Sequence, residues 1–200
     1  HLKIINFKEK YNLNDKFIIM YSGNIGLYYD LENIIKVIGE FKDRQDVIFA
    51  FVGDGTVKDK VEAYVNENNL NNVTFIPYQD KADLIYSLNA ADIHWVVNAK
   101  GIKGVSVPSK LYGVMAAGKP VLGVLDKGSE ARLIVEESNC GVCIEPGNYK
   151  EIKNKINYIL DNKQKIKSLG QKGRIYLEQN LTKDVSINKY KEQILMTDIR

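Results

Sequence analysis

The chain has 200 residues, of which 44% are hydrophobic and 26% are charged, so it holds enough apolar material for one well-buried core, and a single domain is expected. Its 28 basic and 25 acidic side chains are interspersed, which argues against the basic tail or stripe of a nucleic-acid-binding protein. The longest apolar runs, such as Val47 to Val52, are too short to span a bilayer, and we expect a soluble fragment without an export signal.

The order of the predicted elements indicates the fold class. Residues 1–15 are polar and weakly patterned, which suits a linker or an incoming helix. Short runs rich in β-branched and aromatic residues then predict six strands, at residues 17–20, 47–52, 73–76, 93–97, 121–125 and 142–144. Because segments of helical period separate these runs, the sequence predicts an α/β fold with a parallel sheet of about six strands and helices on both faces.

Apolar residues at helical spacing predict the helices. Five are expected between the strands, at residues 31–41, with Asp30 as a candidate N-cap, at 57–65, and after Asp80, Pro108 and Gly128. After Gly147 the strand signal ends, and three terminal helices are expected near residues 152–160, 166–176 and 182–196. We therefore expect one domain over residues 16–181 and a C-terminal helix within residues 182–200.

The two cysteines, Cys140 and Cys143, stand in the string C-G-V-C, whose spacing would permit a redox motif or half of a zinc site. A zinc site needs a second pair of ligands, but the chain has only His1 and His94 as histidines. A redox pair normally begins a helix, whereas residues 142–144 have the pattern of a buried strand. We therefore expect both cysteines to be structural and predict no metal site.

Ligands of open parallel sheets bind at the carboxyl ends of the strands, so the loops after the strands are the places to search. In the first loop, Gly23, Asn24 and Gly26 would allow a phosphate or sugar to approach the backbone, although simple turn chemistry explains these residues equally well. The second loop, Gly53-Asp54-Gly55, favours the turn interpretation, with its acid capping the next helix. In the third loop, Tyr78 is a candidate for stacking on a base, or a packing residue.

The fourth loop is the most informative one. It is rich in glycine and lysine, includes Ser106, and ends at Pro108, which suits the first turn of a helix. It brings Ser109 and Lys110 to a helix N-terminus, where free backbone N–H groups and the helix dipole favour an anion. The residues therefore predict a diphosphate site, and the alternatives are a solvated Lys110 and a capping serine.

The chain resembles a known family in the string P-S-K-L-Y-G-V-M-A-A-G-K-P-V. Further strings agree in the right order, namely S-G-N-I-G, V-G-D-G, A-A-D-I and G-S-E-A-R-L-I-V-E-E-S-N-C-G-V-C-I-E-P-G-N. Together they cover about residues 10–180 and resemble glycosyltransferase family 4 and its group 1 relatives, above all the bacterial sugar transferases of capsule, O-antigen and exopolysaccharide assembly.

The resemblance implies one half of a GT-B enzyme, in which two Rossmann-like domains flank a cleft. This chain would be the C-terminal, nucleotide-sugar-binding domain of a retaining enzyme that transfers a sugar to a polysaccharide or lipid-linked acceptor. It would be inactive without its N-terminal acceptor domain. The implied donor is a UDP-, GDP- or other nucleotide-sugar, and no cofactor or metal is needed, in agreement with the lack of a D-x-D triplet.

Two departures from the family pattern bear on the donor site. Many members carry two glutamates at the positions of Val105 and Gly113, the second gripping the ribose hydroxyls. Many also have an arginine and a lysine at the positions of Asn24 and Tyr29. Lys110 is therefore left as the principal diphosphate cation.

Glu130 could accept hydrogen bonds from sugar or ribose hydroxyls in place of the missing acids, although an acid at a helix start needs no such role. The predicted donor site comprises Gly23, Asn24, Gly26, Tyr78, Ser106, Ser109, Lys110, Leu111 and Glu130.

Two other functions compete with this one. A stand-alone, non-catalytic module could bind a nucleotide or sugar phosphate, but the start at His1 rather than Met favours a piece of a longer enzyme. A dinucleotide-dependent oxidoreductase is disfavoured because the chain has no G-x-G-x-x-G. We expect a cytoplasmic enzyme, peripheral to the inner face of the plasma membrane, whose membrane contact is made only by the absent half and which binds no nucleic acid.

Overall fold

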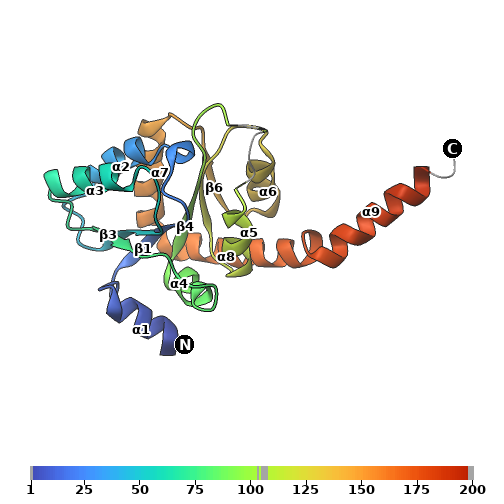
Figure 1. Cartoon of the computed structure of the whole chain (residues 1–200), viewed down its shortest axis with the longest axis horizontal. Coiled ribbons are helices and arrows are strands. Elements are labelled where there is room, and N and C mark those ends of the chain that lie inside the picture. Colours follow the sequence, from blue (N-terminus) through green and yellow to red (C-terminus); the bar gives the residue numbers. More distant parts are fainter. Residues whose placement is uncertain (1, 103, 105–107, 198–200) are drawn as a thin grey trace.

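Six strands are present, β1 (Phe17–Ser22), β2 (Val47–Val52), β3 (Val73–Ile76), β4 (Ile93–Val97), β5 (Val121–Val124) and β6 (Gly141–Ile144). The computed structural model describes residues 2–102, 104 and 108–197 (Figure 1). The strands form one sheet in the order β3-β2-β1-β4-β5-β6, and all neighbouring strands are parallel. The direction of the strand order reverses between β1 and β4. Their carboxyl ends therefore flank the point where open α/β sheets bind ligands.

The five helices predicted between the strands are present, as α2 (Leu31–Gly39), α3 (Lys58–Glu67), α4 (Leu84–Ala90), α5 (Lys110–Ala116) and α6 (Glu130–Ser138). A short 3-10 helix that was not predicted, η1 (Leu27–Tyr29), precedes α2. The terminal ones are α1 (Leu2–Lys10), α7 (Tyr149–Asp161), α8 (Lys163–Asn180) and α9 (Lys183–Thr197).

Helices cover both faces of the sheet, as the alternating pattern predicts. On one face, α2, α3 and α7 pack on alternate residues of the central strands, including Tyr21 of β1 and Trp95 of β4. On the other face, α1 and α4 pack on Ile18 and Met20, and α5 and α6 pack on β4 and β5. Because side chains alternate along a strand, neighbouring residues of β1 and β4 serve opposite faces.

The two expected helix caps have different outcomes. Asp30 is the N-cap residue of α2, as predicted, but its side chain makes no capping hydrogen bond and instead accepts from Asn33 Nδ2 at 2.7 Å and from the Tyr149 hydroxyl at 2.8 Å. The prediction that Asp54 caps the next helix is wrong. Asp54 accepts a hydrogen bond from the Gly55 amide at 2.8 Å, while α3 begins only at Lys58. In both cases the carboxylate forms a tertiary or turn hydrogen bond and does not cap the helix.

The cysteines are free thiols, as expected for structural residues. Cys140 is buried, and Cys143 lies in β6. The apolar pattern of β6 predicted a buried strand, but β6 is an edge strand of the sheet and is therefore partly exposed. Burial raises the pKa of both thiols, to about 12 for Cys143, so neither is a ready nucleophile.

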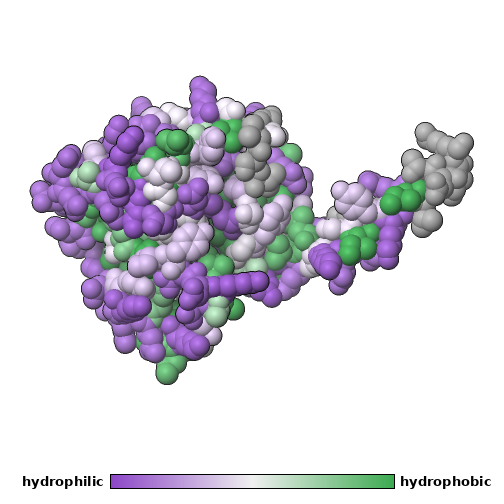
Figure 2. All heavy atoms as spheres, viewed as in Figure 1, coloured by the Kyte–Doolittle hydropathy of each residue, from purple (hydrophilic) through white to green (hydrophobic). Residues whose placement is uncertain are grey.

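The two ends of the chain differ in how they pack. Helix α1 is an incoming helix that buries Phe7 beside Ile18 and Met20. Helix α9 projects from the body of the domain (Figure 1), and Figure 2 shows a few hydrophobic side chains on it. Ile187, Tyr190 and Ile194 of this helix are exposed. No helix in the described ranges has the length and apolarity to cross a bilayer.

Candidate functional site

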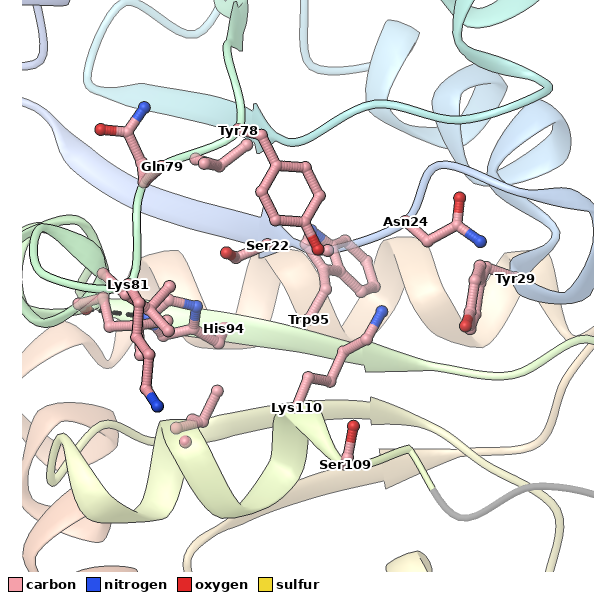
Figure 3. A pocket seen from close by; sticks show the side chains of 16 residues that line it. Ser22, Asn24, Tyr29, Tyr78, Gln79, Lys81, His94, Trp95, Ser109 and Lys110 are labelled. Atoms are coloured by element: carbon pink, nitrogen blue, oxygen red, sulfur yellow. Dashed lines mark hydrogen bonds between the residues drawn. The ribbon is translucent and has the colours of Figure 1, made fainter.

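A cavity of about 540 Å³ lies where β1 and β4 diverge, and five predicted site residues line it (Figure 3). Those five are Gly23, Asn24, Tyr78, Ser109 and Lys110. Other residues that line the cavity were not among the predicted site residues; they include Ser22, Tyr29, Gln79, Lys81, Leu84, Leu88, His94, Trp95 and Gly113. The cavity therefore joins the first, third and fourth loops, as the rule for parallel sheets predicts.

Lys110 is the central cation of the cavity. It is the first residue of α5, and its stem carries the ammonium toward the carboxyl end of β1, as Figure 3 shows. Its Nζ donates a hydrogen bond to the Tyr21 hydroxyl at 2.7 Å and lies 3.9 Å and 4.2 Å from the ring centroids of Tyr21 and Tyr29. The Tyr21 hydroxyl in turn donates to the carbonyl oxygen of Asn24 at 2.5 Å. The ammonium is thus held by two aromatic faces and one hydroxyl.

The electrostatic state of Lys110 follows from these contacts. Within the described ranges no carboxylate forms an ion pair with it. Burial lowers its pKa from 10.5 to about 7, because the ammonium is desolvated without a counter-charge. An anion that entered the cavity would supply the missing charge and raise this pKa again.

The first loop brings its backbone against this lysine. Gly23 has a φ of 144°, and a Cβ at this position would lie 3.4 Å from Lys110 Nζ. The bare backbone at Gly23 therefore leaves room beside the ammonium for a ligand. Gly26, by contrast, precedes η1 and is not among the lining residues.

The second loop holds the first loop in place rather than lining the cavity. The Gly23 amide donates to the Val52 carbonyl oxygen at 2.9 Å, and the Ile25 amide donates to the Asp54 carbonyl oxygen at 2.7 Å. Gly53 has a φ of 141°, and a Cβ there would lie only 2.0 Å from the Gly23 carbonyl oxygen. The loop glycines are therefore required by close backbone packing, as the turn interpretation holds.

Besides Gly26, three more predicted site residues lie apart from the cavity or outside the described residues. Leu111 is fully buried in the core, and its amide donates to the Pro108 carbonyl oxygen at 3.0 Å. Glu130 is an exposed residue at the start of α6 and is not among the lining residues. Ser106 lies outside the described residues.

Two lining residues on β4 gave no usable signal in the sequence. His94 is buried, its Nε2 lies 2.9 Å from the Leu88 carbonyl oxygen, and burial lowers its pKa to about 4, so the ring is neutral at pH 7. Trp95 Nε1 is buried without a hydrogen-bond partner among the described residues. An apolar strand pattern predicts that both residues are buried, but not that a cavity reaches them.

The described residues contain no cluster of three or more His, Cys, Asp or Glu side chains suited to a metal ion. The described residues that line the cavity include two lysines and no carboxylate. With aromatic and apolar side chains around the cations, the cavity suits an anion that carries a flat apolar group.

Sequence comparison identifies similar proteins. A family model described as glycosyl transferases group 1 matches residues 3–176. The probable glycosyltransferase WbjE of Pseudomonas aeruginosa is 31% identical over 175 residues, which are 88% of this chain and 43% of that protein. The putative colanic acid biosynthesis glycosyl transferase WcaI of Escherichia coli (strain K12) is 34% identical over 134 residues, which are 66% of this chain and 33% of that protein. The chain thus spans less than half the length of these curated relatives.

Structural comparison agrees on the fold. The crystal structure of Anabaena HepE in complex with UDP and glucose has a TM-score of 0.78 at 20% identity, over 98% of this chain and 52% of that one. The C-terminal domain of the glycosyl transferase group 1 protein LpcC from Francisella tularensis has a TM-score of 0.72 at 20% identity, over 90% of this chain and 93% of that domain. The second comparison matches one whole Rossmann-like domain.

Proposed function

Because the chain belongs to the glycosyl transferases group 1 family, we propose that it is the donor-binding domain of a GT-B glycosyltransferase and holds the diphosphate of a nucleotide-sugar through Lys110. The observation that carries this proposal is the partly buried ammonium of Lys110, which lines the cavity without a carboxylate partner in the described part of the chain. A desolvated charge without a counter-ion destabilises the fold unless a ligand uses it.

The parts of the nucleotide-sugar are assigned to the parts of the cavity that suit their chemistry. The diphosphate lies at Lys110, beside the bare backbone of Gly23 and the side chains of Asn24 and Ser109. The base, which is flat and apolar, lies toward Tyr78 and the leucines of α4. The sugar, whose hydroxyls need water or polar partners, lies at the open mouth. In this arrangement the domain orients the diphosphate leaving group and partly neutralises its charge as the glycosidic bond to it breaks.

The finer features of the reaction belong to the same proposal. We propose a retaining transfer to a polysaccharide or lipid-linked acceptor. The similarity to a putative colanic acid biosynthesis glycosyl transferase supports a polysaccharide acceptor. A UDP-sugar donor is favoured by the UDP and glucose found with Anabaena HepE. The acceptor is bound by an N-terminal domain absent from this chain, so we expect negligible sugar transfer by the chain alone.

Calorimetric titration of the chain with UDP and GDP in a chelating buffer tests this proposal. We expect at least one nucleotide to bind with a Kd of about 1 mM or tighter, because the cation and the cavity are already in place. Binding is expected without a metal, since the cavity offers lysines and no described carboxylate to a divalent cation. If neither nucleotide bound, the assignment would fail; binding only after addition of Mg²⁺ would refute the metal-free mode.

The affinity for a nucleotide-sugar is expected to fall as the pH rises. The pKa of Lys110 is lowered to about 7 by burial, so the lysine is protonated below this pH and increasingly neutral above it. The bound diphosphate requires the protonated form, and a sugar-esterified diphosphate has no proton of its own to lose in this range. Titration with UDP-glucose is therefore expected to show about a 25-fold weaker Kd at about pH 8.5 than at about pH 6.5.

The unliganded domain is expected to respond to pH with the opposite sign. Between about pH 7 and about pH 10 the unfolded chain holds a proton on Lys110 that the native state has lost, so this group makes the fold more stable as the pH rises.

A variant with Lys110→Met serves as the control for the affinity prediction, since its residual affinity for UDP-glucose is expected to lack the pH dependence. An affinity that stayed constant with pH in the wild-type chain would contradict the role of this lysine.

A further inference from the structure

One hydrogen-bond donor of the cavity has no partner. Trp95 lies in β4 and lines the cavity, and only 2% of its surface is exposed. Its Nε1 is buried and forms no hydrogen bond with any described residue. A buried tryptophan usually places its N–H against an acceptor, because an unpaired buried donor destabilises the fold. Trp95 therefore needs an acceptor that the described part of the chain does not supply.

The neighbour of Trp95 in the strand shows which way the indole points. His94 faces α4, since its Nε2 lies 2.9 Å from the Leu88 carbonyl oxygen. Because successive side chains of a strand alternate, Trp95 points to the opposite face of the sheet, where it packs in the same cluster as Tyr21. Met20 of β1 pairs with His94, so the next residues of the two strands, Tyr21 and Trp95, are neighbours where the strands diverge.

The indole thus lies on the side of the cavity that holds Lys110. The Tyr21 hydroxyl accepts a hydrogen bond from Lys110 Nζ at 2.7 Å, and Figure 3 shows the Trp95 ring and the Lys110 side chain in the same part of the cavity. The described residues that line the cavity include no Asp or Glu. One charged donor and one neutral donor therefore lack an anionic acceptor there, and a negatively charged group with several acceptor oxygens would satisfy both.

A phosphate oxygen suits this N–H better than the other parts of a nucleotide-sugar. An indole N–H only donates, and an ionised diphosphate only accepts, whereas a sugar hydroxyl presents a donor as well as an acceptor. Hydrogen bonds to charged acceptors are also the stronger ones. The base is assigned to the α4 side of the cavity, which His94 faces and Trp95 does not.

We propose, resting on the donor-binding function above, that Trp95 is a further binding residue of this site and that its indole N–H donates a hydrogen bond to a diphosphate oxygen. Lys110 supplies the charge, and Trp95 supplies a donor of fixed direction. Other side chains cover Nε1 in the unliganded domain, so binding includes a small shift of the cavity lining. Tyr78 can make such a shift, because this lining residue is 67% exposed.

Nuclear magnetic resonance of the isotope-labelled chain tests the inference without a substitution. The chain has only one tryptophan, so it gives a single indole N–H resonance. We expect this resonance to move downfield as UDP or GDP, whichever binds more tightly, is added, because a hydrogen bond to an anionic oxygen deshields the proton. Inorganic pyrophosphate is expected to cause the same downfield shift, and it has no aromatic ring whose ring current could produce it.

The outcomes separate this inference from the proposed function. A resonance that stays in place or moves upfield, while calorimetry shows the nucleotide bound, would overturn the role of Trp95 and leave donor binding intact. A downfield shift with the nucleotide but not with pyrophosphate would overturn the assignment of the hydrogen bond to the diphosphate. If neither UDP nor GDP bound, the proposed function would fail and this inference with it.

Trp95→Phe removes the N–H and keeps an aromatic ring. We expect the Kd of the nucleotide to weaken about tenfold or more, because a hydrogen bond to a charged group is lost. Since the smaller ring also leaves a void, Phe49→Leu is the matched control: Phe49 of β2 is buried in the same cluster and is not among the lining residues. This control is expected to be less stable but to keep its affinity within about twofold of the wild-type value. Wild-type affinity in Trp95→Phe, or equal losses in both variants, would overturn the role of the N–H.

Discussion

Replacing Lys110 with methionine is expected to weaken the binding of UDP by about 10- to 150-fold, measured by calorimetric titration near pH 7. Methionine keeps an unbranched apolar stem but removes the ammonium that lies 2.7 Å from the Tyr21 hydroxyl and faces the cavity. The loss corresponds to one charge-assisted contact with the diphosphate, about 1.5–3 kcal/mol. Lys110→Met thus removes the cation of the diphosphate subsite and leaves the rest of the cavity unchanged.

The same substitution is expected to stabilise the unliganded domain. Burial lowers the pKa of Lys110 to about 7, so keeping the ammonium in place destabilises the fold, and its removal is expected to raise the free energy of unfolding by on the order of 1–3 kcal/mol. Urea denaturation measures this change. A substitution that weakens binding and raises stability identifies a residue that serves the ligand. Substitution of a structural residue would lower both the affinity and the stability.

Lys119→Met is the matched control for this prediction. Lys119 is another lysine whose pKa is lowered by burial, but it precedes β5 at the amino edge of the sheet, away from the cavity. Its replacement is expected to leave the affinity for UDP within about twofold of the wild-type value, since a distant side chain rarely couples to a site. Unchanged binding in Lys110→Met, or an equal loss in both variants, would refute the proposed role of Lys110.

Replacing Gly53 with alanine is expected to destabilise the domain by on the order of 3 kcal/mol or more, measured by urea denaturation. The new Cβ would lie 2.0 Å from the Gly23 carbonyl oxygen, a backbone atom that cannot move without displacing the first loop. The φ of 141° adds strain for any residue with a side chain. Because Gly23 lies beside Lys110, the folded fraction of this variant is also expected to bind UDP more weakly.

Gly147→Ala separates the two causes of destabilisation in Gly53→Ala, which are the collision of the new Cβ with the Gly23 carbonyl oxygen and the backbone strain at a positive φ. Gly147 has a φ of 83°, and a Cβ there would meet no atom within 4 Å, so only backbone strain is added. Its substitution is expected to lower the free energy of unfolding by about 1 kcal/mol. Equal losses at the two positions would show that the collision with Gly23 is absent.

Much of the fold could be predicted because its strands and helices have distinct local periods. All six strands appear where their apolar runs predicted them, and Lys110 begins α5 where the turn after Pro108 predicted a helix start. The loop rule for parallel sheets also placed Gly23, Tyr78 and Lys110 around one cavity.

Some of the predictions failed because local patterns do not show which contacts a side chain makes. Asp30 is the N-cap residue of α2, but its carboxylate bonds to Asn33 and to Tyr149, which is 119 residues away, and does not cap the helix. Glu130 was a candidate only because it follows a strand, yet the turn into α6 leaves it exposed and outside the cavity lining. Neither outcome can be derived from local spacing.

The sequence by itself determined the order of the elements and the cation at the start of α5, since hydrophobic period and turn residues act over a few positions. Only the tertiary structure decided what that cation meets. Tyr21 is 89 residues from Lys110, and the two are joined by the parallel pairing of β1 with β4. That pairing surrounds the ammonium with two aromatic rings and leaves it without a carboxylate among the described residues, because burial and charge depend on the packing of distant segments.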